Sequence, residues 1–202
     1  MNKYITEFIG AFFLVLGAIL GGAPGAAMAL MIMVYAGGHI SGAHYNPAVT
    51  LSVWMRGRIE LKHAIMYWIF QLAAAAAAGL IALYVFKQDG NGTCAIPDGG
   101  TLKAIGAELL GTFALAYVVL NVATAKGNAG NSFYGIAIGG TVLAMAIGLG
   151  KFSGGAYNPA VALGLTIQHS FCWDNILIYV FSSLGGGAIA ALVFSLNNPE
   201  DK

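Results

Sequence analysis

Long apolar runs separated by short polar segments dominate the chain, and their lengths predict its elements. Six runs approach the ~20 residues that a helix needs to cross the hydrocarbon core of a bilayer, and two runs of about nine residues can cross only half of it. We therefore expect an all-α membrane protein with six transmembrane helices and two re-entrant half-helices. The predicted spans are Tyr4–Leu20, Gly25–Gly38, Leu61–Phe86, Thr101–Ala125, Ser132–Gly150 and Asn175–Leu196, and the predicted half-helices are Pro47–Met55 and Pro159–Ile167.

The composition supports a membrane protein. Hydrophobic residues make up 58% of the chain and charged residues 8%, whereas a soluble domain carries roughly 25% charged residues. The net charge is +1, and the lysines and arginines are scattered singly, so no basic face is available for nucleic acid. The first run carries Glu7, and no small-residue cleavage pattern follows it, so we expect a retained span rather than a signal peptide.

The central motif of the chain occurs twice. The segment Ser41–Val49 reads SGAHYNPAV, and Ser153–Val161 reads SGGAYNPAV at a distance of 112 positions. A second match pairs Glu7 with Glu108, each followed three residues later by glycine, at a distance of 101 positions. The chain is therefore a duplicated unit.

The duplication predicts an inverted internal repeat within a single domain over 1–202. The two copies cover roughly 1–87 and 101–198, and each holds three spans and one half-helix. An odd number of spans makes the second copy enter the bilayer from the opposite face, so the half-helices meet head to head. With both termini cytoplasmic, the inner side holds six basic residues and the outer side three. The inner residues are Lys3, Arg56, Arg58, Lys62, Lys126 and Lys202, and the outer ones are Lys87, Lys103 and Lys151.

Each half-helix begins with an Asn-Pro-Ala box. Asparagine is a strong N-cap and proline suits the first helical turn, so the boxes start at Asn46 and Asn158. The amide oxygen of each Asn would cap its helix and leave NH₂ donors for a solute in a lumen. Two helix N-termini, each carrying about half a positive charge, would oppose a cation at the midplane. A structural role as ordinary helix starts does not explain two copies in matching positions. The boxes are Asn46, Pro47, Ala48 and Asn158, Pro159, Ala160.

These features resemble the aquaporin, or major intrinsic protein, family. The resemblance rests on the two Asn-Pro-Ala boxes, on the paired Glu7 and Glu108, and on the sequence His39–Gly42 before the first box. It implies six spans with two half-helices, a homotetramer with one pore per protomer, and passive flow of water or small neutral solutes across the lipid bilayer. It also implies that Glu7 and Glu108 brace the re-entrant loops, although a proton relay is the alternative for ionisable groups within spans.

The resemblance also locates a constriction in which this chain departs from the family. The family usually has an arginine at the position of Val161, and water-selective members carry an aromatic residue and a histidine at two others. Small or apolar residues here predict a wide, weakly selective outer constriction. Glycerol, urea and ammonia are then candidate solutes, cation leak is an alternative, and Lys151 or Phe152 could fold inward and refill the gap. The constriction positions are Ala26, Ala146, Gly155 and Val161, and the predicted line of pore carbonyls is Ala43, His44, Gly155 and Ala156.

The remaining polar residues suggest no enzyme. His39 and His44 have no nearby cysteine or carboxylate, so we expect no metal site, and no phosphate loop or nucleophile with a base indicates a cofactor or catalysis. Cys94 and Cys172 both fall on the predicted outer side, where a disulfide or two free thiols are possible.

A secondary transporter also uses inverted repeats, but this chain has few intramembrane charges for ion coupling, and a purely structural protein would leave the Asn boxes without a purpose. We therefore predict a multi-pass channel of the cell membrane.

Overall fold

A computed structural model describes residues 1–90 and 100–201, and their regular elements are all helical. Five of these helices are long and apolar enough to cross a membrane. Two shorter helices coincide with the predicted half-helices at both ends. The main helices are α1 (Asn2–Ser41), α2 (Pro47–Met55), α3 (Leu61–Tyr84), α4 (Gly100–Val119), α5 (Tyr134–Ser153), α6 (Pro159–Ile167) and α7 (Ile176–Asn197), with short helical turns at Leu120–Thr124, Lys126–Asn128 and Trp173–Asn175.

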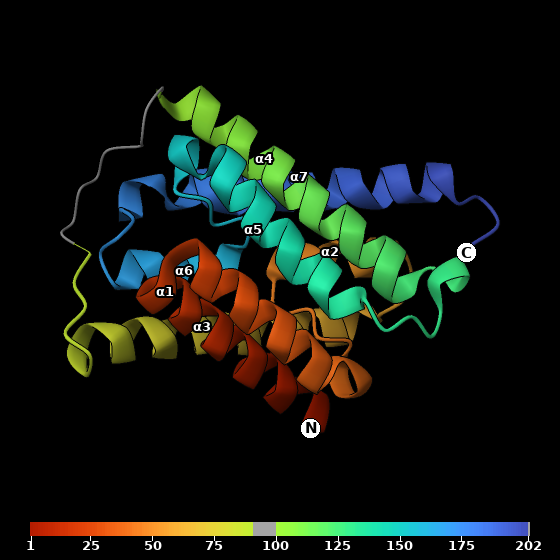
Figure 1. The fold of residues 1–202 in the computed structure, drawn as a ribbon, viewed down its shortest axis with the longest axis horizontal. Coiled ribbons are helices and arrows are strands. Elements are labelled where there is room, and N and C mark those ends of the chain that lie inside the picture. The colour runs from red at the N-terminus through yellow and green to blue at the C-terminus, as the bar shows by residue number, and fades with distance from the viewer. Residues whose placement is uncertain (91–99, 202) are drawn as a thin grey trace.

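Helix α1 contains the first two predicted spans, which is why five long helices account for six predicted crossings. Its path breaks at Gly22, which has φ 57° and ψ −147°, a conformation open mainly to glycine. The two arms fold back on each other, because the backbones of Gly17 and Gly25 are in close contact (Figure 1). The connection predicted between Leu20 and Gly25 is therefore a bend without a loop.

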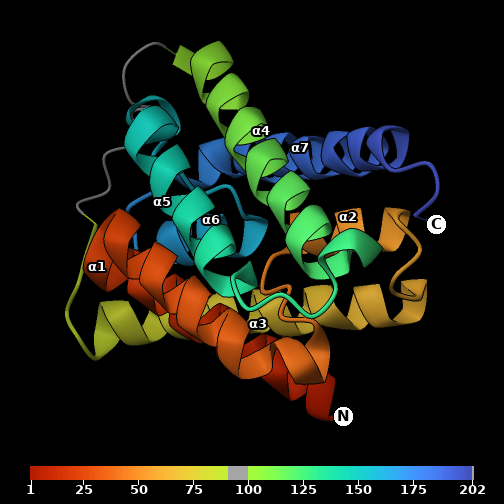
Figure 2. The same ribbon diagram turned by 45° about the vertical axis from the view of Figure 1, so that its right-hand side comes forward.

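The two half-helices interlock the repeats. Helix α2 packs mainly against α7 of the second copy, and α6 packs mainly against α3 of the first. Figures 1 and 2 show both half-helices enclosed by the longer helices. At one of these contacts the hydroxyl of Ser52 donates to the carbonyl oxygen of Gly187, 2.8 Å away. Because each half-helix is held by a span from the other copy, neither copy can complete the core alone.

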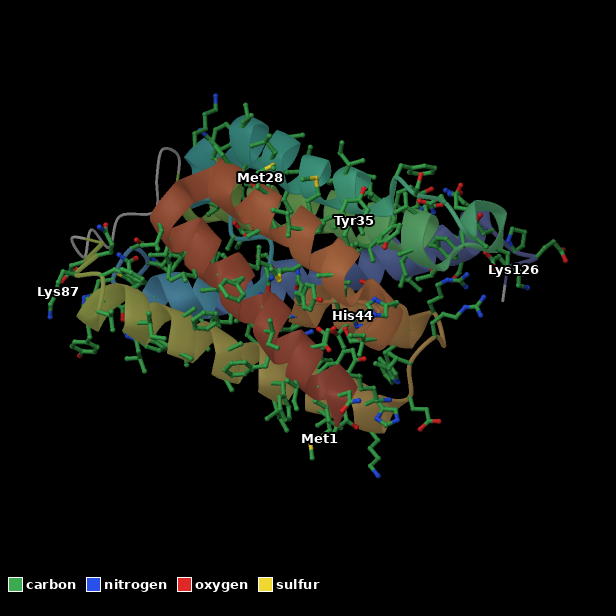
Figure 3. The ribbon with its side chains drawn as sticks, turned by 60° about the horizontal axis from the view of Figure 1, so that its bottom comes forward. Met1, Met28, Tyr35, His44, Lys87 and Lys126 are labelled. Atoms are coloured by element: carbon green, nitrogen blue, oxygen red, sulfur yellow. The ribbon has the colours of Figure 1, made fainter. Side chains whose placement is uncertain are left out.

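Both ends of the chain lie at the same end of the molecule. Lys3 and Arg58 line one cavity, and the carboxylate of Asp201 lies 3.3 Å from the guanidinium of Arg58 and 3.0 Å from that of Arg56. Lys87 lies at the opposite end from Lys126 (Figure 3). This arrangement requires an even number of crossings and agrees with six spans.

Asp201 ties the C-terminal segment to the end of α2. The buried Arg56 side chain donates through Nε to the hydroxyl of Thr124 at 2.7 Å and through a terminal nitrogen to the backbone carbonyl of Asp201 at 2.7 Å. Its guanidinium also lies 4.3 Å from the ring centre of Phe194. The backbone N–H of Lys126 donates to the Asp201 carboxylate at 2.8 Å. This last hydrogen bond, aided by Arg56, lowers the pKa of Asp201 below its ordinary value of 3.8.

Replacing this carboxylate should loosen the C-terminal tie at every pH at which the carboxylate is charged. A lowered pKa means that the stabilisation is present above pH 3.8 and is lost as the pH falls through the folded-state pKa. We expect Asp201→Asn to lower the Tm in detergent by the same amount between pH 5 and pH 8, and the difference from wild type to shrink on acidification. Glu200→Gln, which changes a neighbouring exposed carboxylate, is the control. An unchanged Tm for Asp201→Asn at pH 7 would show that the tie contributes nothing.

Candidate functional site: the meeting point of the half-helices

Two asparagine side chains join the re-entrant loops at the N-termini of α2 and α6. The amide oxygens of Asn46 and Asn158 each accept from the backbone N–H two residues later, at 2.8 and 2.9 Å. Each amide nitrogen donates to the opposite loop. Asn46 Nδ2 lies 2.9 Å from the carbonyl oxygen of Tyr157, and Asn158 Nδ2 lies 3.0 Å from that of Tyr45. An amide NH₂ has two donors, so one of each pair joins the loops and the second is left for the cavity.

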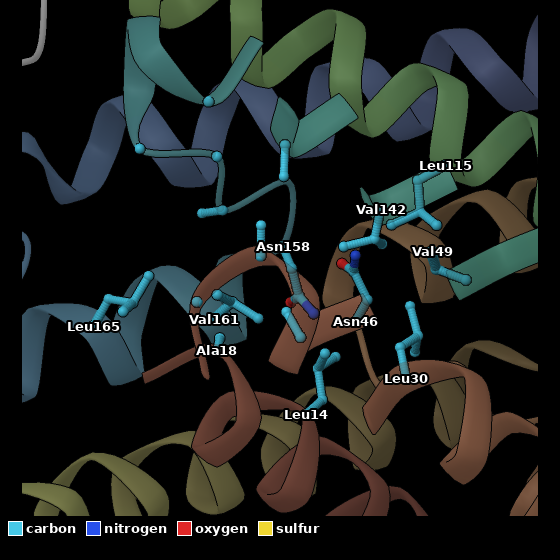
Figure 4. Close-up of a pocket in the computed structure, with 18 of the residues that line it drawn as sticks. Leu14, Ala18, Leu30, Asn46, Val49, Leu115, Val142, Asn158, Val161 and Leu165 are labelled. Atoms are coloured by element: carbon cyan, nitrogen blue, oxygen red, sulfur yellow. The ribbon is translucent and has the colours of Figure 1, made fainter. Parts of the chain in front are cut away.

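A cavity of about 360 Å³ extends to both sides of this meeting point. Figure 4 shows the amides of Asn46 and Asn158 near its middle, with Val161 toward one side and Leu30 and Val49 toward the other. Among the described residues that line it, four have polar side chains: His44, Asn46, Asn158 and Ser170. The wall is otherwise apolar or glycine, so a solute in this cavity would find few hydrogen-bonding side chains besides the two asparagines.

The predicted pore positions gather around this one cavity. All four constriction positions line it, as do all four residues of the predicted carbonyl line. Lys151 and Phe152, the side chains considered for refilling the constriction, are not among its lining residues, and the Lys151 amine lies 4.9 Å from the centre of the Phe152 ring instead. Ser170 and Phe171 line the cavity in their place. No local sequence pattern indicates these two residues, because the turn after α6 brings them to the cavity.

Glu7 and Glu108 hold the re-entrant loops through hydrogen bonds and do not line the cavity. The carboxylate of Glu7 accepts from the backbone N–H groups of His44 and Tyr45, at 3.0 and 2.7 Å, and from the side chain of Gln71 at 2.8 Å. Glu108 accepts from the backbone N–H groups of Ala156 and Tyr157, at 2.9 and 2.7 Å. Both carboxyl groups are fully buried, and burial of such a group is costly unless it is hydrogen-bonded. These contacts support a bracing role over a proton relay, because the donors are backbone N–H groups of the loops and the amide of Gln71 rather than a chain of titratable side chains.

Two serines and two tyrosines, for which no role was predicted, complete the brace. Ser41 and Ser153 donate through their hydroxyls to Glu7 and Glu108, both at 2.7 Å. Their own carbonyl oxygens accept from the hydroxyls of Tyr67 and Tyr179, at 2.6 and 2.7 Å. The serines and the tyrosines are each separated by 112 positions, like the boxes. Applying that spacing to every polar residue would have found them.

The brace keeps the loops in an unusual backbone conformation. Ala43, Tyr45 and Tyr157 have φ values of 51°, 49° and 49°, a left-handed region that costs roughly 1–3 kcal/mol for residues other than glycine. Such strain persists only where surrounding contacts over-determine the backbone. The Glu carboxylates and the crossing Asn amides are those contacts.

The first loop is held by more side chains than the second. The ring nitrogen Nδ1 of His44 lies 3.1 Å from the hydroxyl of Thr50, and Trp68 donates through its indole N–H to the carbonyl oxygen of Pro47 at 3.0 Å. The positions 112 residues further along are alanine, alanine and valine for His44, Thr50 and Trp68. The two halves therefore share the core brace and differ in the outer contacts.

The predicted cysteine pair is only partly described. Cys172 is buried and disulfide-bonded, whereas Cys94 lies outside the described residues. A bridge between the two therefore stays a prediction.

Removing one carboxylate of the brace should destabilise the protein. In Glu108→Gln the side-chain NH₂ would face N–H donors, so at least one buried N–H group loses its acceptor, at a cost of about 1–3 kcal/mol. We expect Glu7→Gln and Glu108→Gln each to lower the Tm measured by circular dichroism in detergent. Glu60→Gln, at a carboxylate with a side chain 82% exposed, should leave it unchanged. A Tm of either brace variant equal to that of wild type would contradict the role of these carboxylates.

Comparison with known proteins agrees with this geometry. Residues 1–194 match the model of the family described as "Major intrinsic protein". The chain is 35% identical to Aquaporin NIP1-4 of Oryza sativa subsp. japonica over 97% of this chain and 77% of that protein. It is 31% identical to Nodulin-26 of Glycine max over 100% of this chain and 80% of that protein.

A solved structure shows the same fold at lower identity. The aquaglyceroporin from Plasmodium falciparum superposes with a TM-score of 0.76 at 21% identity, over 98% of this chain and 94% of that one. The family consists of integral membrane channels for water or small solutes rather than of enzymes. The chain belongs to the major intrinsic protein family.

Proposed function

We propose that each protomer forms one pore that conducts water and other small neutral solutes. The observation that carries this proposal is the cavity that has two amide groups near its middle and mostly apolar walls. A neutral molecule can exchange one hydrogen bond at a time with Asn46 and Asn158 there. The apolar walls bind it weakly elsewhere, and weak binding allows fast exit.

The head-to-head half-helices supply the barrier against cations. The N-terminus of each helix carries about half a positive charge, and the caps Asn46 and Asn158 place both N-termini at the same point of the cavity. The second N–H group of each asparagine amide also presents a partial positive charge to the cavity. Cations would therefore meet repulsion at the midplane even though the family's usual arginine is replaced by Val161.

A wide constriction favours solutes larger than water. Ala26, Ala146, Gly155 and Val161 line the cavity and bring neither a cation nor a hydrogen-bond donor in their side chains. Glycerol, urea and ammonia are the candidate solutes besides water. A carrier with the same fold is the alternative, and its flux would saturate.

The domain organisation, the oligomeric state and the membrane location of the pore also belong to this proposal. We expect the chain to act as one domain built from the repeats 1–87 and 101–198, to assemble as a homotetramer, and to lie in the cell membrane with both termini cytoplasmic. Large apolar side chains are exposed on several helices, as expected for a surface that contacts lipid or neighbouring protomers. Examples are Met28, Ile69, Leu110, Phe181 and Leu192.

Stopped-flow light scattering on proteoliposomes tests the proposal. Vesicles containing the protein should shrink faster than empty vesicles under an impermeant osmolyte, and should re-swell quickly in glycerol or urea. The flux should rise linearly with solute concentration and show no counterflow effect. Water and solute fluxes equal to those of empty vesicles would contradict the channel, and saturation with counterflow would indicate the carrier.

Restoring a cation at the constriction should narrow the pore. In Val161→Arg the guanidinium would occupy space beside Gly155 and bind hydroxyl groups, so we expect the glycerol permeability to fall by roughly tenfold, as for other changes of a pocket by a few heavy atoms. Water permeability should fall much less. Val161→Leu is the control for added volume without charge. Equal glycerol fluxes in Val161→Arg and wild type would mean that this position does not limit passage.

A further inference from the structure

Phe171 contributes an aromatic ring to the cavity from outside the predicted constriction. It lines the cavity together with its neighbour Ser170 and with Gly154. It follows the C-terminus of α6, and its backbone N–H lies 3.1 Å from the carbonyl oxygen of Leu165. The ring therefore reaches the pore from the turn after the half-helix, whereas the four constriction positions lie on α1, α5, the second re-entrant loop and α6.

The Phe171 ring is held in place on one face and at one edge. It stacks on Tyr179 with 4.3 Å between ring centres and 16° between planes, and the hydroxyl of Tyr179 is itself fixed on the carbonyl oxygen of Ser153. On another side the ring lies against Gly154, where an added β-carbon would fall 2.6 Å from a ring carbon. An aromatic side chain has only two rotatable bonds, and packing of this kind restricts both.

The same turn occurs in the first half with a different side chain. The residue 112 positions before Phe171 is Ile59. Ile59 lines a second cavity, the one lined by Lys3 and Arg58 at the other end of the molecule. In both halves the residue two positions earlier has a positive φ, which is 76° for Gly57 and 68° for His169. The repeat therefore places this position in the lining of a cavity in both halves, and only in the second half is the side chain aromatic.

We propose that Phe171 sets the upper limit on the width of solutes that enter the pore. The side chains at the four constriction positions are small or apolar, so the largest rigid group near that end of the cavity is this ring. The face of the ring away from Tyr179 can contact the apolar part of a solute, while the Ser170 hydroxyl, which donates to the side-chain oxygen of Gln168 at 2.6 Å, can still accept a hydrogen bond. The inference rests on the proposed channel function and adds the residue that determines its size selectivity.

A size series at this position tests the inference. Proteoliposomes containing wild type, Phe171→Ala, Phe171→Leu and Phe171→Trp are compared for water, urea, glycerol and erythritol permeability. We expect erythritol and glycerol permeability to rise by roughly tenfold in Phe171→Ala and to fall by a similar factor in Phe171→Trp. Phe171→Leu should be intermediate, and water permeability should change by less than about twofold across the series.

Two comparisons separate this role from a structural one and from failure of the channel itself. Phe152→Ala removes an aromatic ring near the same end of α5 without touching the cavity lining, and should leave every permeability at the wild-type value. Damage to the fold would lower all fluxes together instead of changing their order by solute size. Wild-type fluxes above those of empty vesicles with an identical size dependence in all Phe171 variants would overturn this inference alone. Wild-type fluxes at the level of empty vesicles would overturn the proposed function.

Discussion

The crossing of two amide hydrogen bonds is the contact on which the rest of the structure depends. Asn46 and Asn158 cap their own half-helices with the amide oxygen and donate with the amide nitrogen to the loop of the other repeat. A shorter or apolar side chain could not do both. The N-termini of the two half-helices therefore meet at the same point of the cavity. The hydrogen bonds that hold the fold together also position the polar groups of the pore.

The crossing bonds need loops that stay in a strained conformation, and buried acids supply that restraint. Glu7 and Glu108 each accept hydrogen bonds from two successive backbone N–H groups of a loop. These N–H groups therefore do not bond to the carbonyl groups of the same segments. Ser41 and Ser153 link each acid to the helix before its loop. The intramembrane acidic residues Glu7 and Glu108 are thus explained by architecture, and neither of them lines the cavity.

Local chemistry and repetition made much of this predictable. The half-helices Pro47–Met55 and Pro159–Ile167 begin and end where predicted, because an Asn-Pro start is a local signal. The hairpin in α1 was not predicted as one helix with a bend, because a single glycine, Gly22, replaces the expected loop. The contacts of Asp201 and Phe171 depend on residues far along the chain, and no local pattern reports them. The family resemblance identified several positions that line the cavity, but not which loop side chain reaches it.

The most direct test of this account replaces both crossing amides with carboxylates. In the double variant Asn46→Asp, Asn158→Asp each side chain can still cap its helix, but neither can donate to the opposite loop, and two negative charges enter the cavity. Na⁺ permeability and water permeability are measured on the same proteoliposomes, with the wild type as reference. The account predicts a lower water permeability and measurable Na⁺ entry in the double variant. Water permeability and Na⁺ exclusion both equal to those of wild type would contradict it.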